Sequence, residues 1–477
     1  MADMLALDGH EVSVLMNNRV KNHIITKHAS VVSFDIPGNV TAITDLSMEE
    51  LNYDGFSYVE NIKNLANAQI SFCESMFQNK RVMTTLKDSH FELVIADMFS
   101  LCNNVLTTHL NTTTIWYQNY GFFPDMHGFF PHFPSFTCLA IGTFCVSDDM
   151  TFSERVLNAV FHVATNYIFF PTFMPAQYKL AEDAGLELGN PIEEALSDKV
   201  IIINVDYVLD TPRPTMPHIF TFSGLFHKKP SPLPLEFQNI IDQSGKHGVV
   251  LLSFGTLVPK FDTKTAEIFA RVLGRLEQQV IWRYIGDKPR GLQKNTHLME
   301  WFPQNDLLAN PAVKLFITHC GISSTFESAY NGVPVVAMPL FADQTYNAKK
   351  LTDRIRMGIE LDYYNVKEDD FEAGINEVLS NPVYRENAKR ASLVMSDQLV
   401  PPVERFKHLV NFTVKTEGAK HLFHPYAVRM SWFTFYGLDV LSFLLFILLG
   451  FSLVTYMVCK ACYKVFFRSG KSKEKKS

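Results

Sequence analysis

The chain has 477 residues, 47% of them hydrophobic and 19% charged, so it is long enough for two or three globular domains. Its 23 glycines and 23 prolines exclude collagen-like and low-complexity classes. The 43 basic and 49 acidic side chains give a formal net charge of -6, without the basic excess of a general nucleic-acid binder. The composition therefore predicts a folded protein with no nucleic-acid partner. Its 40 phenylalanines indicate much apolar surface for a core, an apolar ligand or a bilayer.

The first half of the chain has the pattern of an open α/β sheet. A short helix is predicted over residues 1–7, ended by Gly9, and a longer one over residues 59–78. Strands of the buried type are predicted at 11–16, 31–36, 93–96, 113–117 and 200–204. Strands that alternate with helices favour a parallel sheet.

Residues 121–137, rich in Phe, Pro and Gly, interrupt this alternation, and the apolar helical stretch 152–170 follows them. These segments fit a core helix with a packed loop. They fit equally well an apolar wall for a ligand, or a patch that rests on a bilayer.

Residues 227–247 are rich in Lys, Pro, Ser and Gly and are predicted to be an interdomain linker. It divides an N-terminal domain, 1–226, from a C-terminal domain, 248–430. The second domain has predicted strands at 249–254, 280–284, 313–318 and 334–338, with helices from about 263 and at 324–330. We therefore expect two doubly wound domains, with the deepest cleft between them at the carboxyl ends of their strands.

Val440–Val458 carries no charge and is about long enough to cross a bilayer as a helix. The predicted anchor, 431–459, starts with an aromatic belt, and the basic tail, 460–477, predicts a cytosolic C-terminus. The belt consists of Trp432, Phe433, Phe435 and Tyr436. Lys473 and Lys475 match the dilysine pattern of endoplasmic reticulum residents. The expected location is the endoplasmic reticulum membrane, as a single-pass type I protein with a lumenal body.

Three glycosylation sequons, at Asn39, Asn111 and Asn411, agree with a lumenal body. The opening residues 1–10 have neither the basic region nor the apolar region of a signal peptide, so we expect either that a segment N-terminal to this sequence is missing or that this form is not translocated in the usual way.

Seven cysteines are too sparse for a disulfide scaffold and lack the paired spacing of a zinc site, so no metal is expected. Cys459 and Cys462 have the spacing of a redox motif, but they directly follow the apolar segment. A membrane-proximal pair, open to palmitoylation, is the simpler interpretation.

Two predicted strand ends in the second domain have residues suited to phosphate. Ser253, Gly255 and Thr256 follow the first strand of this domain, which by itself is a weak signal. The second place is stronger, because it combines an imidazole, a glycine and two hydroxyls at a helix N-terminus: His319, Gly321, Ser323 and Ser324. One helical turn further, Glu327 could accept both ribose hydroxyls, or could instead be a capping-box partner of Ser324.

Trp301 and Gln304 offer an aromatic face and an amide for a base, and Asp343 and Gln344 offer groups for sugar hydroxyls. From Trp301 through the His319 segment to Gln344, the sequence resembles the signature of the UDP-glycosyltransferases, in particular the membrane-bound animal UDP-glucuronosyl and UDP-glucosyltransferases. The resemblance extends over essentially the whole chain.

The resemblance implies a GT-B fold, with two Rossmann-like domains and a transmembrane anchor. It implies a UDP-sugar co-substrate without a further cofactor, and a small lipophilic acceptor in the N-terminal domain. By position, Trp301 would stack on uracil with Phe302 and Gln304 beside it, and Glu327 would hold the ribose. The diphosphate would be bound by Ser253, Gly255, Thr256, His319, Gly321, Ser323 and Ser324. Asp343 and Gln344 would contact the sugar and favour glucose or glucuronic acid.

The family's catalytic base is a histidine after the first N-terminal strand, oriented by an aspartate. Asp97 matches that aspartate, whereas the matching histidine and strand are expected upstream of this sequence. His10 resembles a turn residue of the family, and His127 and His132 are the next candidates for a base.

The expected function is inverting transfer of glucuronic acid or glucose to lipophilic compounds. The alternative is a catalytically silent UDP-sugar-binding subunit that pairs with active relatives, as a homo- or hetero-oligomer.

Overall fold

The computed structural model describes residues 1–18, 26–36, 69–98, 100–119, 151–164, 170–187, 199–212, 215–256, 261–341, 343–423, 431–435 and 437–471. The described residues up to Phe423 belong to one compact unit, and those from Ser431 onward belong to a second one. Each unit is described by itself.

The second half of the larger unit is built on a six-stranded parallel sheet with the order β12-β11-β10-β7-β8-β9. The strands are β7 (Val249–Ser253), β8 (Gln279–Arg283), β9 (Thr296–Met299), β10 (Val313–Thr318), β11 (Val335–Ala337) and β12 (Gly358–Glu360). The chain starts at β7, moves outward through β8 and β9, then returns to β10 and moves outward the other way. This reversal creates a topological switch point between β7 and β10.

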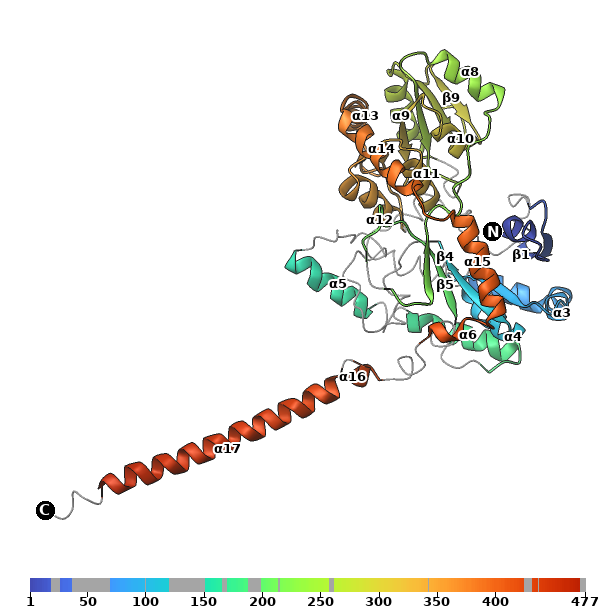
Figure 1. The fold of residues 1–477 in the computed structure, drawn as a ribbon. Coiled ribbons are helices and arrows are strands. Elements are labelled where there is room, and N and C mark those ends of the chain that lie inside the picture. The colour runs from blue at the N-terminus through green and yellow to red at the C-terminus, as the bar shows by residue number, and fades with distance from the viewer. Residues whose placement is uncertain are drawn as a thin grey trace. The chain divides into compact units, whose positions relative to one another are not determined.

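Helices cover both faces of this sheet (Figure 1). They are α8 (Leu235–Gln243), α9 (Thr263–Gly274), α10 (Gln304–Leu308), α11 (Ile322–Tyr330), α12 (Gln344–Lys349), α13 (Glu368–Ser380) and α14 (Pro382–Ser396), with a π-helical turn, η4 (Lys350–Arg354). Successive β7 side chains enter opposite cores, because side chains alternate along a strand. Val249 and Leu251 pack with α8, α11 and α14, whereas Val250 and Leu252 pack with α9 and α13.

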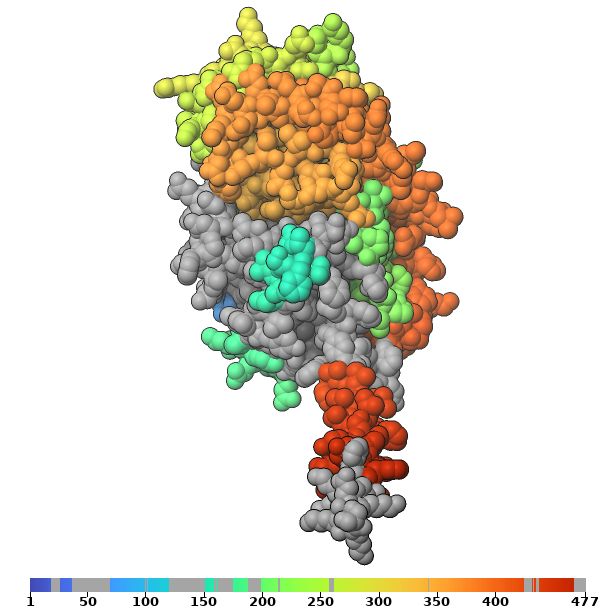
Figure 2. Space-filling view, turned by 90° about the vertical axis from the view of Figure 1, so that its left-hand side faces the viewer, coloured from blue at the N-terminus to red at the C-terminus, as the bar shows by residue number. Residues whose placement is uncertain are grey.

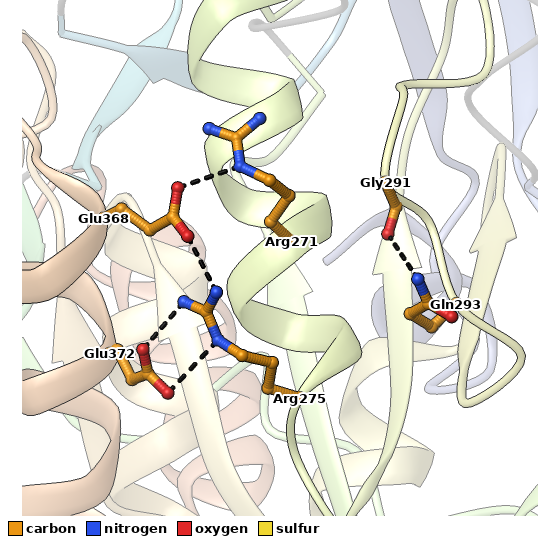
Figure 3. Close-up of polar contacts among 6 residues, drawn as sticks. All are labelled: Arg271, Arg275, Gly291, Gln293, Glu368 and Glu372. Atoms are coloured by element: carbon orange, nitrogen blue, oxygen red, sulfur yellow. Dashed lines mark hydrogen bonds and ion pairs between the residues drawn. The ribbon is translucent and has the colours of Figure 1, made fainter.

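On one face, α9 and α13 are also joined by a network of ion pairs (Figure 3). Arg275 contacts Glu368 and Glu372 at 2.7 Å each, and Arg271 contacts Glu368 at 2.8 Å. All four side chains are partly exposed, so water and salt screen these attractions. The stronger link is the buried stack of Phe269 on Phe371, whose ring centroids are 4.3 Å apart.

The first half of the unit contains two separate parallel sheets among its described residues. The larger has the order β3-β4-β5-β6: Leu93–Asp97, Thr113–Gln118, Val200–Asn204 and Ile219–Phe222. The smaller pairs β1 (Ser13–Asn17) with β2 (Ser30–Phe34). The described helices are α1 (Ala2–Ala6), α3 (Lys80–Asp88), α4 (Leu101–Leu110), α5 (Phe152–Ala164) and α6 (Phe170–Asp183), and residues 69–78, the second half of the helix predicted over 59–78, are also helical. A single open sheet was expected, and the predicted strands lie in these two sheets instead.

The late helix α15 (Pro402–Lys415) packs against strands of the first half, beside β4 and β5 (Figure 1). Phe406, Leu409 and Val410 share a buried cluster with Ile115 of β4 and Ile202 of β5. A 3-10 turn, η5 (Lys420–Leu422), follows the helix. The segment after residue 402 was predicted as part of the C-terminal domain, yet its apolar face completes the core of the first half.

The predicted linker contains helix α8, whose Phe237, Ile240 and Ile241 are buried in the core beneath the six-stranded sheet. This part of the segment is therefore a packed helix of the second half. The Pro and Lys content of its flanks hid the helical spacing of these three side chains. Strands β6, β9 and β12 were not predicted; each has only three or four residues, and β9 and β12 lack a continuous apolar run.

Cys73 and Cys102 form a disulfide in the first half. Both lie in a buried cluster with α3, α4 and α6. Their separation of 29 residues gave no signal in the sequence, because a bridge between two elements depends on tertiary proximity.

Helix α5 has exposed apolar side chains, among them Phe152 at 75% and Val160 at 59% exposure. Figure 2 shows α5, in turquoise, at the surface of the unit. Such exposure does not fit the core-helix alternative, so the ligand wall and the bilayer patch remain. The neighbouring segment 121–137, with His127 and His132, lies outside the described residues, as do residues 59–68 of the second predicted helix.

The smaller unit consists of α16 (Trp432–Phe435) and α17 (Leu438–Lys471). Within α17, Leu438–Phe466 is long and apolar enough to cross a membrane, which confirms the predicted candidate span by length and composition. Tyr436 of the predicted belt and the dilysine pair Lys473 and Lys475 lie outside the described residues, as does the sequon residue Asn39.

Candidate donor site at the carboxyl ends of β7 and β10

Two adjacent strands bring the two predicted phosphate segments together. Ser253 at the end of β7 is in register with Thr318 at the end of β10, and His319 follows Thr318 directly. A Cβ atom built on Gly255 or on Gly321 would lie 2.6 Å from Nε2 of His319. The imidazole is therefore enclosed by two glycine backbones, one from each segment, and neither position has room for a side chain.

His319 is only 8% exposed. Its burial lowers its pKa to about 4, with a backbone contact from Ser253 opposing this shift and the charge of Arg283 adding to it. The ring is consequently neutral near pH 7. A neutral imidazole can donate or accept one hydrogen bond to a ligand, but it supplies no positive charge.

Arg283 supplies a positive charge close to this place, and it was not among the residues predicted from the sequence. It is the last residue of β8, the neighbour of β7. Its Nη1 donates to the carbonyl oxygen of Gly255, and its Nε donates to that of Glu300 over 3.2 Å. Burial lowers its pKa from the ordinary arginine value. In the sequence, Arg283 could have been found as the charged residue that ends the apolar strand β8, next to β7, which ends in Ser253.

Helix α11 presents its N-terminus at the same edge of the sheet. Its N-cap is Gly321, and no side chain caps the helix. The first-turn N–H groups and the positive end of the helix dipole are therefore available to an anion. Ser324 is buried in the first turn, whereas Ser323 is exposed, as is Thr256.

Gln304 of α10 connects the hydroxyl and the carboxylate of α11. Its Nε2 donates to Oε2 of Glu327 over 2.7 Å and to Oγ of Ser324 over 3.1 Å. Burial raises the pKa of Glu327, and the hydrogen bond from Gln304 opposes this. The capping-box alternative for Glu327 is not realised, because the N-cap is a glycine and the carboxylate is bonded to Gln304 instead.

The two aromatic residues before Gln304 have different environments. Trp301 is 65% exposed, so its indole face is open to a ligand. Phe302 is 3% exposed and packs in the core beneath the sheet. The Phe302 side chain is therefore used for packing, and the predicted role of this residue in UDP-sugar binding stays a prediction.

Asp343 and Gln344 begin α12, beyond the end of β11. The Asp343 carboxylate accepts from Nδ2 of Asn347 over 2.7 Å, and burial raises its pKa. The Oε1 atom of Gln344 accepts from the backbone N–H groups of Leu340 and Phe341, at 2.9 and 3.2 Å. Gln344 thus also shapes the loop that leads into α12.

A buried ion pair lies next to this loop. Nζ of Lys350 is 2.7 Å from Oδ1 of Asp210, and both side chains are almost fully buried. The Tyr346 hydroxyl donates to the same oxygen over 3.2 Å, and its ring lies 4.1 Å from Nζ. The pair joins the loop after β5 to the turn after α12, so it connects the two halves of the larger unit.

Asp97 is in the four-stranded sheet, at the end of β3, with an exposed side chain. Its carbonyl oxygen accepts from Nδ2 of Asn103 over 2.8 Å. His10 lies 4.0 Å from the carboxylate of Asp8, in the turn after α1. Among the described residues, no three His, Cys, Asp or Glu side chains are grouped as a metal site.

Together, the two halves built on parallel sheets and the switch point with its glycines, buried imidazole and uncapped helix define a nucleotide-binding α/β protein. The model of the UDP-glucuronosyl and UDP-glucosyl transferase family matches residues 2–474, and the chain belongs to this family.

Among curated relatives, the chain is similar to UDP-glucuronosyltransferase 1A1 of Mus musculus, with 32% identity over 489 residues, which covers 98% of this chain and 89% of that protein. It is 34% identical to UDP-glucuronosyltransferase 1A8 of Rattus norvegicus, over 85% of this chain and 76% of that protein.

Among solved structures, the spinosyn forosaminyltransferase SpnP has a TM-score of 0.59 and 17% identity, over 86% of this chain and 94% of that chain. The UDP-glucose: anthocyanidin 3-O-glucosyltransferase, solved with UDP, has a TM-score of 0.57 and 15% identity, over 87% of this chain and 95% of that chain. These similarities confirm the predicted GT-B fold.

Proposed function

We propose that this protein transfers glucuronic acid or glucose from a UDP-sugar to small lipophilic acceptors. The observation that carries the proposal is the enclosure of the His319 imidazole by Gly255 and Gly321 at the switch point, beside the uncapped N-terminus of α11. Neutral donors and free N–H groups at such a place suit a diphosphate.

The donor roles follow the order of the residues along this edge. Ser253, Thr256, Ser323 and Ser324 would bind the diphosphate together with His319 and the two glycine backbones, and Arg283 would supply a charge nearby. Trp301 would stack on the base. Gln304 and Glu327 are already bonded to each other, so the ribose hydroxyls would be held by a pre-oriented amide and carboxylate. Asp343 and Gln344 would contact the sugar, and no further cofactor is needed.

For catalysis, we propose that Asp97 orients a histidine base that takes the proton of the acceptor hydroxyl while the sugar is transferred with inversion. The domains would be residues 1–226 for the acceptor and 248–430 for the donor, with α15 returning to the first. The exposed apolar face of α5 would contribute to an apolar acceptor region or rest on the bilayer.

The location that we propose is the endoplasmic reticulum membrane, with a lumenal body, a cytosolic tail and family members as oligomeric partners. The disulfide between Cys73 and Cys102 supports a lumenal body, because disulfides persist in oxidising compartments. The span in α17 supports an anchor. The sequon residues Asn111 and Asn411 are exposed, and glycosylation there is part of the proposal.

The test is UDP release by the full chain in detergent, with UDP-glucuronic acid and UDP-glucose as donors and a panel of phenols and aliphatic alcohols as acceptors. In a form extended by the strand and the histidine expected upstream, we expect release with at least one donor and a lower rate for Asp97→Asn, with Asp183→Asn as the exposed control. UDP binding without any release would support the silent-subunit alternative instead. Absence of UDP binding would contradict both.

A further inference from the structure

A cavity of about 720 Å³ lies at the opposite end of the six-stranded sheet from the candidate donor site. Its walls come from the segments that precede β7, β10 and β11, and from the end of α13 and the start of α14. These are the amino ends of the strands, so the cavity is separated from Ser253 and His319 by the length of the sheet. Nothing in the proposed transfer reaction uses it.

The charged side chains that line this cavity are all cations. Lys246, Lys314, Arg385 and Lys389 line it, and none of its lining residues is an aspartate or a glutamate. His247 also lines it, with its Nδ1 3.0 Å from the exposed carboxylate of Glu277. The lining is thus cationic, although the chain as a whole has a formal net charge of -6.

The guanidinium of Arg385 is held in this cluster by three hydrogen bonds to backbone carbonyl oxygens. Nη2 donates to the carbonyls of Val313 and Lys314, and Nη1 donates to that of Gly332. Burial lowers the pKa of Arg385 to about 10. The three carbonyl bonds fix the guanidinium in place, so its charge is pre-positioned without being neutralised.

Two further features favour an anion. The pKa of Lys314 is lowered by burial first and then by the charges of Arg385 and Lys389, so the three cations repel one another. The 15-residue helix α14 also starts here, with Asn381 as its N-cap and Pro382 in the wall. Its positive dipole end adds to the same field.

We propose that this cavity is a second anion site, which binds a phosphate-bearing small molecule at the same time as a nucleotide occupies the donor site. The volume is that of a ligand pocket for a nucleotide-sized molecule. Part of the wall is apolar, with Leu308, Val333 and Leu379, so it can pack against the organic part of such a ligand. The ligand's phosphate oxygens would bond to Lys246, Lys389 and Arg385, whose free N–H groups are charged donors.

The experiment is calorimetric titration of the full chain in detergent, saturated with UDP so that the donor site is filled. The probes are inorganic tripolyphosphate, ATP and a water-soluble short-chain phosphatidylinositol phosphate. The test variant is Lys246→Glu with Lys389→Glu, two exposed residues of the cavity. Lys294→Glu with Lys420→Glu, also exposed but outside the cavity, makes the same change of net charge and is the control.

We expect one probe molecule to bind per chain. Its affinity should be at least about tenfold weaker in the test variant and less than about twofold weaker in the control. Tighter binding of ATP would indicate a soluble organic phosphate, and tighter binding of the short-chain lipid would indicate a lipid headgroup; both support the site. No binding of any probe, or equal loss in both double variants, would overturn it. The experiment measures binding of the probe and not of UDP. A failure of the second anion site can therefore be told apart from a failure of the proposed sugar transfer.

If the double charge reversal lowers the folded fraction, Lys389→Gln serves instead, since it removes one charge from an exposed helix position. Unchanged probe affinity in a folded Lys389→Gln chain, together with unchanged affinity in Lys246→Gln, would also overturn the proposal.

Discussion

The two ends of the six-stranded sheet differ in how their buried polar and charged side chains are accommodated. At the carboxyl ends, His319 is uncharged near pH 7 and Lys350 is paired with Asp210 at 2.7 Å, while Arg283 is a cation that donates to the carbonyl oxygens of Gly255 and Glu300. At the amino ends, Arg385 and Lys389 are in a cavity without a lining carboxylate. Neutral groups can be buried at modest cost when they are hydrogen-bonded, whereas an unpaired charge must keep contact with water or an anion. The first end is therefore suited to a tightly enclosed ligand and the second to an exchangeable one.

The largest contrast is expected from removing one cation at each end. Lys350→Met should lower the free energy of unfolding by about 3 to 5 kcal/mol, because the buried Asp210 is left without its partner. Lys389→Met, at an exposed position, should change it by less than about 0.5 kcal/mol. Urea denaturation followed by tryptophan fluorescence measures both. The double variant Asp210→Asn with Lys350→Met should regain most of the loss, and equal losses for the two single variants would remove the contrast.

The next effect concerns the enclosure of His319. Gly321→Ala should weaken UDP binding by about 10- to 100-fold, because the new Cβ would lie 2.6 Å from Nε2 of the imidazole. Gly245→Ala is the control: it has a positive φ of 53°, but nothing lies within 4 Å of the added Cβ. Calorimetry with UDP measures the binding, and circular dichroism verifies the fold. A Gly321→Ala chain with native affinity would show that the imidazole does not contact the ligand.

A smaller effect is expected at Glu327. Glu327→Ala should weaken UDP binding by about 1 to 3 kcal/mol, since a charge-assisted hydrogen bond to the ribose is lost. Gln304→Ala should reproduce part of this loss, because its amide orients the carboxylate over 2.7 Å. Glu236→Ala, an exposed change on α8, is the control. If a folded Glu327→Ala chain binds UDP normally, the carboxylate serves only to hold Gln304.

The smallest effect is the pH dependence of stability. The pKa of His319 is lowered from 6.5 to about 4 in the folded chain, so the unfolded chain binds more protons between these values. The stabilisation from the neutral ring is complete above pH 6.5 and is lost as the pH falls toward 4. From pH 7 to pH 5, wild type should lose at most about 2 kcal/mol more than His319→Gln. Equal losses in urea denaturation would mean that the ring titrates normally.

The sequence alone determined the second half of the chain well. The strands near 249, 280, 313 and 335 are short apolar runs bounded by turn residues, and runs of this length with such flanks are typical of buried parallel strands. His319, Gly321 and Ser324 could be named because a strand end followed by a glycine and a helix start is a local pattern. The apolar segment in α17 is equally local, because its length and lack of charge define it.

Other features were decided only by the tertiary structure. Arg283 joins the site because β8 pairs with β7, and the Phe302 side chain packs in the core beneath the sheet. The return of α15 to the first half, the Cys73 to Cys102 bridge and the cation cavity bring together residues far apart in the chain. Local propensity specifies strands and turns, but contacts between distant residues depend on how the sheets and helices pack, which no short window of sequence contains.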